Sequence, residues 1–265
     1  MRRFARLSAT TSWWLPYATG AALATGVLVV LVWQVVVRGP IVAADWPLHE
    51  LLTTRVPDGA GRVVLDSLAR PGQRWLTLPL LLVVGAWVSW RQRRLQPMLA
   101  VLTGLGTAYL VGKTVKDGLS RTPPYKDVDI LHGVGAAFPS GHAANAAMTW
   151  ALISVLLFGA SGLWPNRRRL RHGLAVSAGL AVLVGVTMVV MDYHWLSDVP
   201  GGWVVGLLAL MLALLALGPA PSLENEHTRD GGQSLATAGQ AEPVRGGAAD
   251  GDGSADRLRE DRLGL

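Results

Sequence analysis

Long segments without any Asp, Glu, Lys or Arg constrain this 265-residue chain more than any other feature. A helix needs about 20 apolar residues to cross the hydrocarbon core of a bilayer, and six uncharged segments reach or approach that length. They lie at residues 13–37, 75–90, 95–112, 143–163, 173–191 and 199–217. A single span satisfies its backbone hydrogen bonds only as a helix. The sequence therefore predicts an all-α fold, a bundle of six transmembrane helices.

The shortest of these segments, 75–90, is flanked by Arg74 and Arg91 and contains Trp75 and Trp90 at its ends. Long cationic side chains can reach from a short span to the polar interface, which tryptophan also favours. We therefore expect these four residues to anchor the segment. The first segment follows a basic N-terminus, as in a signal peptide, but it is much longer than the apolar region of such a peptide. A span is the favoured interpretation.

The basic character of the chain, with a pI of about 10.3, comes from clusters in short connections. We therefore interpret the basic clusters as determinants of membrane topology, and we expect no nucleic-acid partner. The clusters are Arg2, Arg3 and Arg6, then Arg91, Arg93 and Arg94, then Arg167, Arg168, Arg169 and Arg171. The positive-inside rule makes their side cytoplasmic. Residues 116–139 and 192–198 then lie on the extracytoplasmic side.

Two domains are predicted. Residues 1–218 form a multi-pass membrane domain, in which 42–69 lies along the outer interface because its apolar residues are semi-amphipathic. Residues 219–265 contain few large apolar side chains, and we expect a disordered cytoplasmic tail. The chain has no cysteine, which excludes disulfides, thiolate catalysis and cysteine-ligated metals.

Two short motifs at the ends of uncharged segments carry the polar chemistry. The motif Pro139–His142 (Pro-Ser-Gly-His) comes directly before one uncharged segment. His194 and Asp198, which are four residues apart, come directly before another uncharged segment. A glycine at a helix N-terminus lets free N–H groups approach an anion. A carboxylate beside an imidazole fixes its tautomer and raises its basicity, as a histidine nucleophile requires. Together these features predict a phosphate-handling site.

Cations that could hold a phosphate precede these motifs on the same predicted face. Lys113 and Lys116 end one uncharged segment, and Arg121 follows. Phosphoryl transfer needs such cations around the phosphate oxygens. The alternative interpretation is that they are interfacial anchors. Among the other polar residues, Asp192 is read as a span-end cap, and His49, His132 and Asp127 as solvated residues of outer loops.

These motifs resemble those of the type 2 phosphatidic-acid phosphatase superfamily, the lipid phosphate phosphatases, whose three motifs are K-x6-R-P, P-S-G-H and S-R-x5-H-x3-D. The resemblance covers about residues 95–217, the expected catalytic core. It implies that His194 is a nucleophile that forms a phosphohistidine, that Asp198 orients it, and that His142 protonates the leaving oxygen. It implies that the phosphate is held by Lys116, Arg121, Ser140, Gly141 and, as an alternative first-motif lysine, Lys113. Family members need no metal, so the resemblance implies neither a metal site nor a cofactor.

Two departures from the family motifs bear on rate and substrate. Met188 stands where the third motif has arginine, and Thr187 where it has serine. In the first motif, Arg121 comes two residues early when counted from Lys116 and one late from Lys113. Losing a charge-assisted clamp costs about a few kcal/mol of transition-state stabilisation. An arginine at position 188 is therefore expected to raise kcat if its side chain fits, unless Lys113 or Lys126 already compensates.

The leading hypothesis is an integral-membrane phosphohydrolase that acts on a lipid phosphate or diphosphate at the outer leaflet. Polyprenyl diphosphate, phosphatidate and phosphatidylglycerol phosphate are the candidate substrates. Two alternatives are a catalytically weakened relative that binds or transports lipid phosphates, and a phosphoryl transferase. The soluble vanadium-haloperoxidase branch shares the motifs but is disfavoured by six spans. The expected partners are the lipid substrate and the bilayer.

Overall fold

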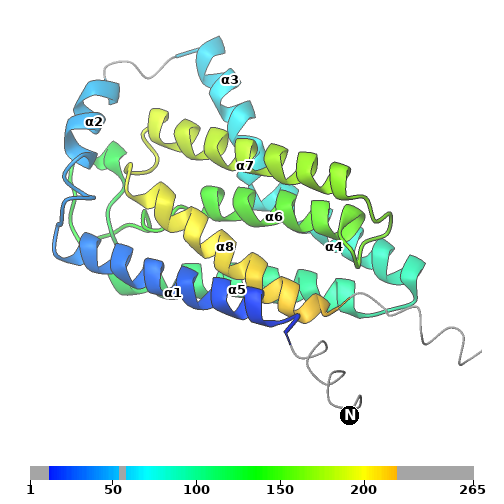
Figure 1. Ribbon diagram of the computed structural model, residues 1–265. Helices are drawn as coiled ribbons and strands as arrows, with labels where there is room; N and C mark the ends of the chain where they lie inside the picture. Colours follow the sequence, from blue (N-terminus) through cyan, green and yellow to red (C-terminus); the bar gives the residue numbers. More distant parts are fainter. Residues whose placement is uncertain (1–11, 54–57, 220–265) are drawn as a thin grey trace, which may run out of the picture. The chain divides into compact units, whose positions relative to one another are not determined.

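The computed structural model describes residues 12–53 and 58–219, and in these residues it contains helices and no strand (Figure 1). The all-α prediction is confirmed for this part of the chain. The N-terminal arginines and the tail from residue 220 lie outside the described residues. The elements are α1 (Leu15–Val36), α2 (Asp45–Thr53), α3 (Ala60–Ala69), η1 (Arg70–Gly72), α4 (Arg74–Gln92), α5 (Gln96–Leu119), η2 (Pro124–Lys126), α6 (Gly141–Phe158), α7 (Arg167–Val190) and α8 (Asp198–Leu217), where η marks a 3-10 helix.

Five of the described helices are long and apolar enough to cross a membrane, namely α1, α5, α6, α7 and α8. The helix α4 corresponds to the shortest predicted span and is not among them. It has 19 residues, contains Pro79, and packs against α5 and α6. A multi-pass membrane protein is therefore supported, and a sixth span through α4 stays a prediction.

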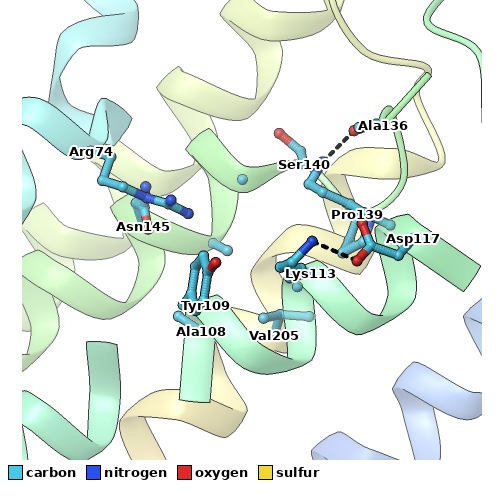
Figure 2. A pocket seen from close by; sticks show the side chains of 14 residues that line it. Arg74, Ala108, Tyr109, Lys113, Asp117, Ala136, Pro139, Ser140, Asn145 and Val205 are labelled. Atoms are coloured by element: carbon cyan, nitrogen blue, oxygen red, sulfur yellow. Dashed lines mark hydrogen bonds and ion pairs between the residues drawn. The ribbon is translucent and has the colours of Figure 1, made fainter. Parts of the chain in front are cut away.

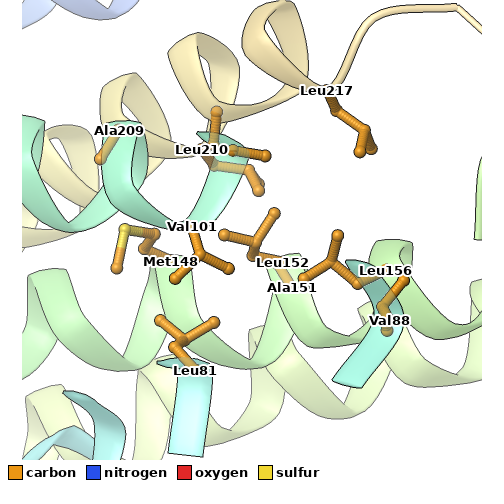
Figure 3. Close-up of a cluster of buried hydrophobic side chains, with 12 residues drawn as sticks. Leu81, Val88, Val101, Met148, Ala151, Leu152, Leu156, Ala209, Leu210 and Leu217 are labelled. Atoms are coloured by element: carbon orange, nitrogen blue, oxygen red, sulfur yellow. The ribbon is translucent and has the colours of Figure 1, made fainter. Parts of the chain in front are cut away.

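The main apolar core lies where α4, α5, α6 and α8 meet (Figure 3). Leu81 from α4, Val101 from α5, and Met148 and Leu152 from α6 are all fully buried there. In a bilayer, helices gain little from hiding apolar surface because the lipid is equally apolar. Close interdigitation of side chains is therefore what holds these four helices together.

Glycines bring α8 unusually close to α6. A Cβ added at Gly202 would lie 2.3 Å from the Ser140 carbonyl oxygen, and one at Gly206 would lie 2.5 Å from that of Ala144. Small residues four apart let the backbones of two membrane helices approach each other. The N-termini of α6 and α8, which carry both sequence motifs, are thereby held side by side.

The two motifs meet at one end of the bundle. The helix α5 ends there, α6 and α8 begin there, and α2 lies beside the connections at the same end (Figure 1). The arginine-rich connections from α4 to α5 and from α6 to α7 lie at the other end. The fold therefore separates the polar motifs from the described arginine clusters by the length of the bundle.

Candidate active site

The imidazole of His194 contacts the carboxylate of Asp198 at the start of α8. Nδ1 of His194 lies 3.3 Å from Oδ2 of Asp198, and the same oxygen accepts a hydrogen bond of 3.0 Å from the Trp195 backbone N–H. His194 lies in the turn before α8, where its own N–H donates to the Met188 carbonyl at 3.2 Å. With Nδ1 protonated and donating to Asp198, Nε2 carries a free lone pair. This is the arrangement of an oriented nucleophile or base.

Asp198 is held in turn by Arg121, which is 1% exposed. A guanidinium has five N–H donors, and here every one has a partner. Nε and Nη2 donate to Asp129 at 2.8 and 2.9 Å. Nη1 donates to Ser197 and Asp198 at 2.8 and 2.9 Å, and Nη2 also donates to Asp45 at 2.8 Å. The guanidinium lies 5.3 Å from the centre of the Trp195 ring. Arg121 is thus engaged with carboxylates, and its predicted contact with a phosphate would require it to release one of them.

Asp45 joins the outer helix α2 to this network and was missed by the sequence analysis. Its carboxylate accepts hydrogen bonds from the Ser197 backbone N–H at 2.8 Å and from the Ser197 hydroxyl at 2.6 Å, besides the bond from Arg121. The residue is 2% exposed. Burial raises the pKa of Asp45, and its hydrogen bonds from Ser197 and Arg121 oppose that rise. The only signal in the sequence was an acidic residue at the start of a short amphipathic segment.

A polar pocket of about 240 Å³ opens beside this network, between α4, α5 and the start of α6 (Figure 2). Lys113, Lys116, Ser140 and Gly141 line it, together with Arg74 and Asn145. Lys113 forms an ion pair of 2.6 Å with Asp117, and Lys116 donates to the Ala136 carbonyl. Three cations and one carboxylate, Asp117, thus line a pocket at a helix N-terminus, and this excess of positive charge suits an anion.

His142 directly follows Gly141 in the chain, and His194 lines a separate, small cavity of about 10 Å³ together with Asp45 and His49. Lys116 is attracted by Asp198 and repelled by Arg74, and His142 is within range of charge repulsion from both His194 and Lys116. The two histidines therefore lie at the same end of the bundle as the predicted phosphate-binding residues, although neither histidine lines the larger pocket. Arg121 does not line it either, because it points into the carboxylate network. Lys126 also turns elsewhere and donates to the Val134 carbonyl at 2.6 Å.

The Met188 side chain lies in an apolar cluster with Ala69, Ala146, Val184 and Met191. It is 2% exposed. A guanidinium placed there would have to leave water for apolar surroundings, which costs several kcal/mol when no counter-charge is present. The packing therefore argues against the expected gain in kcat from an arginine at position 188.

The expectation that His49 is solvated is wrong. It is 7% exposed, and its ring nitrogens contact Asp192 at 2.7 Å and Asp127 at 3.2 Å. Asp192 lies just beyond α7, as a capping residue would, but its side chain pairs with His49. Burial raises the pKa of Asp192, and the contact with His49 opposes that rise. Asp127 and His132 are exposed, as expected.

Within residues 12–53 and 58–219, no group of three or more His, Asp or Glu is placed to hold a metal ion.

Residues 97–220, somewhat less than half of the chain, match the PAP2 superfamily, which is the family that the three motifs resemble. Phosphatidylglycerophosphatase B of Bacillus subtilis (strain 168) is 28% identical over 149 residues, which cover 56% of this chain and 71% of the relative.

Two further comparisons extend this picture. The crystal structure of a transmembrane PAP2-type phosphatidylglycerolphosphate phosphatase from Bacillus subtilis superposes with a TM-score of 0.61. The two chains are 24% identical, and the match covers 73% of this chain and 94% of that one, which shows a shared fold. A lipoprotein signal peptidase of Parasynechococcus marenigrum (strain WH8102) is 28% identical over 152 residues, covering 52% of this chain and 92% of that protein.

We expect Asp45→Asn to lower both stability and turnover. The amide replaces one acceptor oxygen with a donor, and so leaves Arg121 or Ser197 with a buried unpaired group. Breaking a buried ion pair from one side typically costs about 3–5 kcal/mol. Thermal unfolding in detergent measures the loss, and Glu50→Gln is the matched control because Glu50 is an exposed carboxylate on the same helix. Equal unfolding temperatures for the two variants would contradict the structural role of Asp45.

Proposed function

We propose that this chain is an integral-membrane phosphohydrolase that removes phosphate from a lipid phosphate or diphosphate. The observation that carries the proposal is that a cationic pocket at the N-terminus of α6 and the His194–Asp198 pair at the start of α8 lie at the same end of the bundle. The match of residues 97–220 to the PAP2 superfamily supports it. The pocket supplies the charge that a phosphate needs, and the pair supplies an oriented nucleophile.

In the proposed reaction, Nε2 of His194 attacks the phosphorus in line with the ester oxygen. The N–P bond forms as the P–O bond breaks, and His142 donates a proton to the departing lipid oxygen. Asp198 stabilises the charge on the imidazole through Nδ1. Water then attacks the phosphohistidine with His142 accepting its proton, which breaks the N–P bond and releases inorganic phosphate. Lys113, Lys116, Ser140 and Gly141 hold the phosphate oxygens, and Arg121 holds Asp198.

An apolar cleft next to the pocket supports a lipid as the substrate. Thr77 and Leu78 of α4 and Leu105 of α5 line this cleft, which shares Arg74, Ala108, Tyr109 and Asn145 with the polar pocket. A phosphate in the pocket would therefore place its lipid chain between α4 and α5. The similarity to phosphatidylglycerophosphatase B favours phosphatidylglycerol phosphate among the three candidate substrates.

The opposite face of the bundle offers a second apolar cleft, between α2, α7 and α8, lined by residues that include Leu48, Val186 and Trp203. Its lining contains no Lys or Arg. It shares residues with the small cavity that His194 lines, among them Leu48 and Leu196, but that cavity too is lined by no Lys or Arg. We therefore assign the substrate chain to the cleft between α4 and α5.

Other functions use the same groups differently. A lipid-phosphate binding or transport protein would bind substrate without releasing phosphate, and a phosphoryl transferase would pass it to an acceptor other than water. A peptidase that uses two carboxylates sharing a proton would need a pair free of cations. Asp45 and Asp198 are both bound to Arg121, which disfavours that chemistry here.

His194→Ala should abolish phosphate release from every substrate that the protein accepts, by roughly 10³-fold or more, because it removes the proposed nucleophile. Phosphate release is measured in detergent with the three candidate lipids, together with trapping of an acid-labile phosphoenzyme. The wild-type activity should persist in EDTA, because imidazole and cations carry out every proposed step. Near wild-type turnover of the variant would refute the assignment of His194.

The site should face the periplasm or the cell exterior, because the arginine-rich connections lie at the other end of the bundle. Val134→Cys tests this, since Val134 is 84% exposed in the connection before α6 and the chain has no cysteine of its own. A membrane-impermeant thiol reagent should label it in intact cells. Trp164→Cys, in the connection from α6 to α7, should react only after lysis. The reverse pattern would overturn the orientation.

Leu105→Trp should slow the turnover of long-chain lipid phosphates by roughly tenfold or more, because an indole would block the cleft that positions the chain. A water-soluble short-chain phosphatidate should be cleaved at nearly the wild-type rate. Val186→Trp, in the opposite cleft, is the matched control and should affect neither substrate. If Val186→Trp alone discriminates against long chains, the chain lies between α7 and α8 instead.

A further inference from the structure

Arg74, at the first residue of α4, faces the polar pocket. Its position at the end of a short uncharged segment predicted an interfacial anchor. In the structure it lines the pocket together with Lys113, Lys116 and Ser140, and Figure 2 shows its side chain extending into the pocket from the side opposite Lys113. It also lines the apolar cleft between α4 and α5. Arg74 therefore stands where the polar and apolar parts of the proposed lipid site meet.

The backbone before Arg74 is fixed against α6. A Cβ added at Gly72 would lie 2.5 Å from the His142 carbonyl oxygen, so only glycine permits this approach. The Asn145 amide donates to the Gly72 carbonyl at 3.2 Å, and the Trp150 indole donates to that of Pro71 at 3.0 Å. Three contacts thus hold η1 on the first turns of α6. The backbone at Arg74 is therefore held in place relative to the Ser-Gly-His motif before any ligand binds.

The charge of Arg74 is not neutralised in the free protein. Its guanidinium lies 5.4 Å from the centre of the Tyr109 ring, and within the described residues no carboxylate lies within ion-pair distance of it. Lys113, by contrast, is paired with Asp117. Arg74 repels Lys116 across the pocket, and an anion between the two would relieve that repulsion. The Tyr109 ring supports the cation from one side and leaves its N–H groups free for a ligand.

We propose that Arg74 is a phosphate-binding residue, which supplies from α4 the guanidinium that is absent at Met188 on α7. This inference rests on the proposed function of the same site. A guanidinium binds two oxygens of one phosphate in a fixed, bidentate geometry, and Arg121 is already occupied by carboxylates. Arg74 is then the guanidinium open to substrate at this pocket, beside the two lysines.

The experiment compares Arg74→Ala, Arg74→Lys and Arg74→Gln with Arg70→Ala. Arg70 is exposed, lies four residues upstream and does not line the pocket, so its loss changes the surface charge alone. We expect Arg74→Ala to lower kcat/KM for the best lipid phosphate by about 100-fold. Inhibition by orthovanadate, a phosphate-like oxyanion, should weaken by about tenfold or more. Arg74→Lys should fall between Arg74→Ala and wild type, and Arg70→Ala should match the wild type in both measurements.

The outcomes separate this inference from the proposed function. If the wild type releases phosphate and Arg74→Gln behaves as Arg70→Ala does, Arg74 is only an anchor and the inference fails alone. If the wild type releases none, binding of orthovanadate and of a lipid phosphate is measured directly by titration calorimetry. Binding that depends on Arg74 would then sustain the inference although hydrolysis is refuted, and binding indifferent to Arg74 would overturn it. Should Arg74→Ala fail to fold, the pair Arg74→Lys and Arg74→Gln still isolates the charge.

Discussion

A single buried guanidinium ties together the parts of this protein that carry its chemistry. Arg121 receives a carboxylate from α2, one from the connection before α6, and one from the first residue of α8. A buried cation is tolerated only when it is paired and fully hydrogen-bonded. The irregular outer segments are therefore fixed to the end of the bundle, and Asp198 is fixed with them. The orientation of His194 depends on this network through Asp198.

In this structure, one arginine binds internal carboxylates and a different one faces the open pocket. Arginine binds carboxylates and phosphates through the same planar array of donors, so a motif arginine alone does not reveal which anion it meets. In this chain the motif residue Arg121 meets three carboxylates. The cations that face the open pocket are Lys113, Lys116 and Arg74. Lys113 contacts Asp117, and Lys116 donates to the Ala136 carbonyl, but each ammonium has three N–H donors and therefore keeps donors for a ligand.

The phosphate and the lipid chain of the proposed substrate need different surroundings. A phosphate gives up its hydration only where donors and cations replace water, whereas a lipid chain needs no more than an apolar surface. The cleft between α4 and α5 leads directly to such donors, at Arg74 and Asn145. The cleft between α7 and α8 has the apolar surface without a cation. Charge, rather than apolar area, therefore distinguishes the two faces.

The sequence by itself determined the all-α class, the five longest spans and the pairing of His194 with Asp198, because these follow from local patterns. Uncharged runs of sufficient length must be helical in a bilayer, and the short segment from His194 to Asp198 keeps these two side chains close although His194 precedes α8. What the tertiary structure decided involves partners far apart in the chain. Asp45 meets Ser197, His49 meets Asp192, and Gly72 meets His142. A polar residue near the end of a span has the same local pattern whether it faces lipid headgroups, a buried counter-charge or a ligand pocket. Only the packing of the helices placed Arg74 at the pocket and Arg121 among three carboxylates.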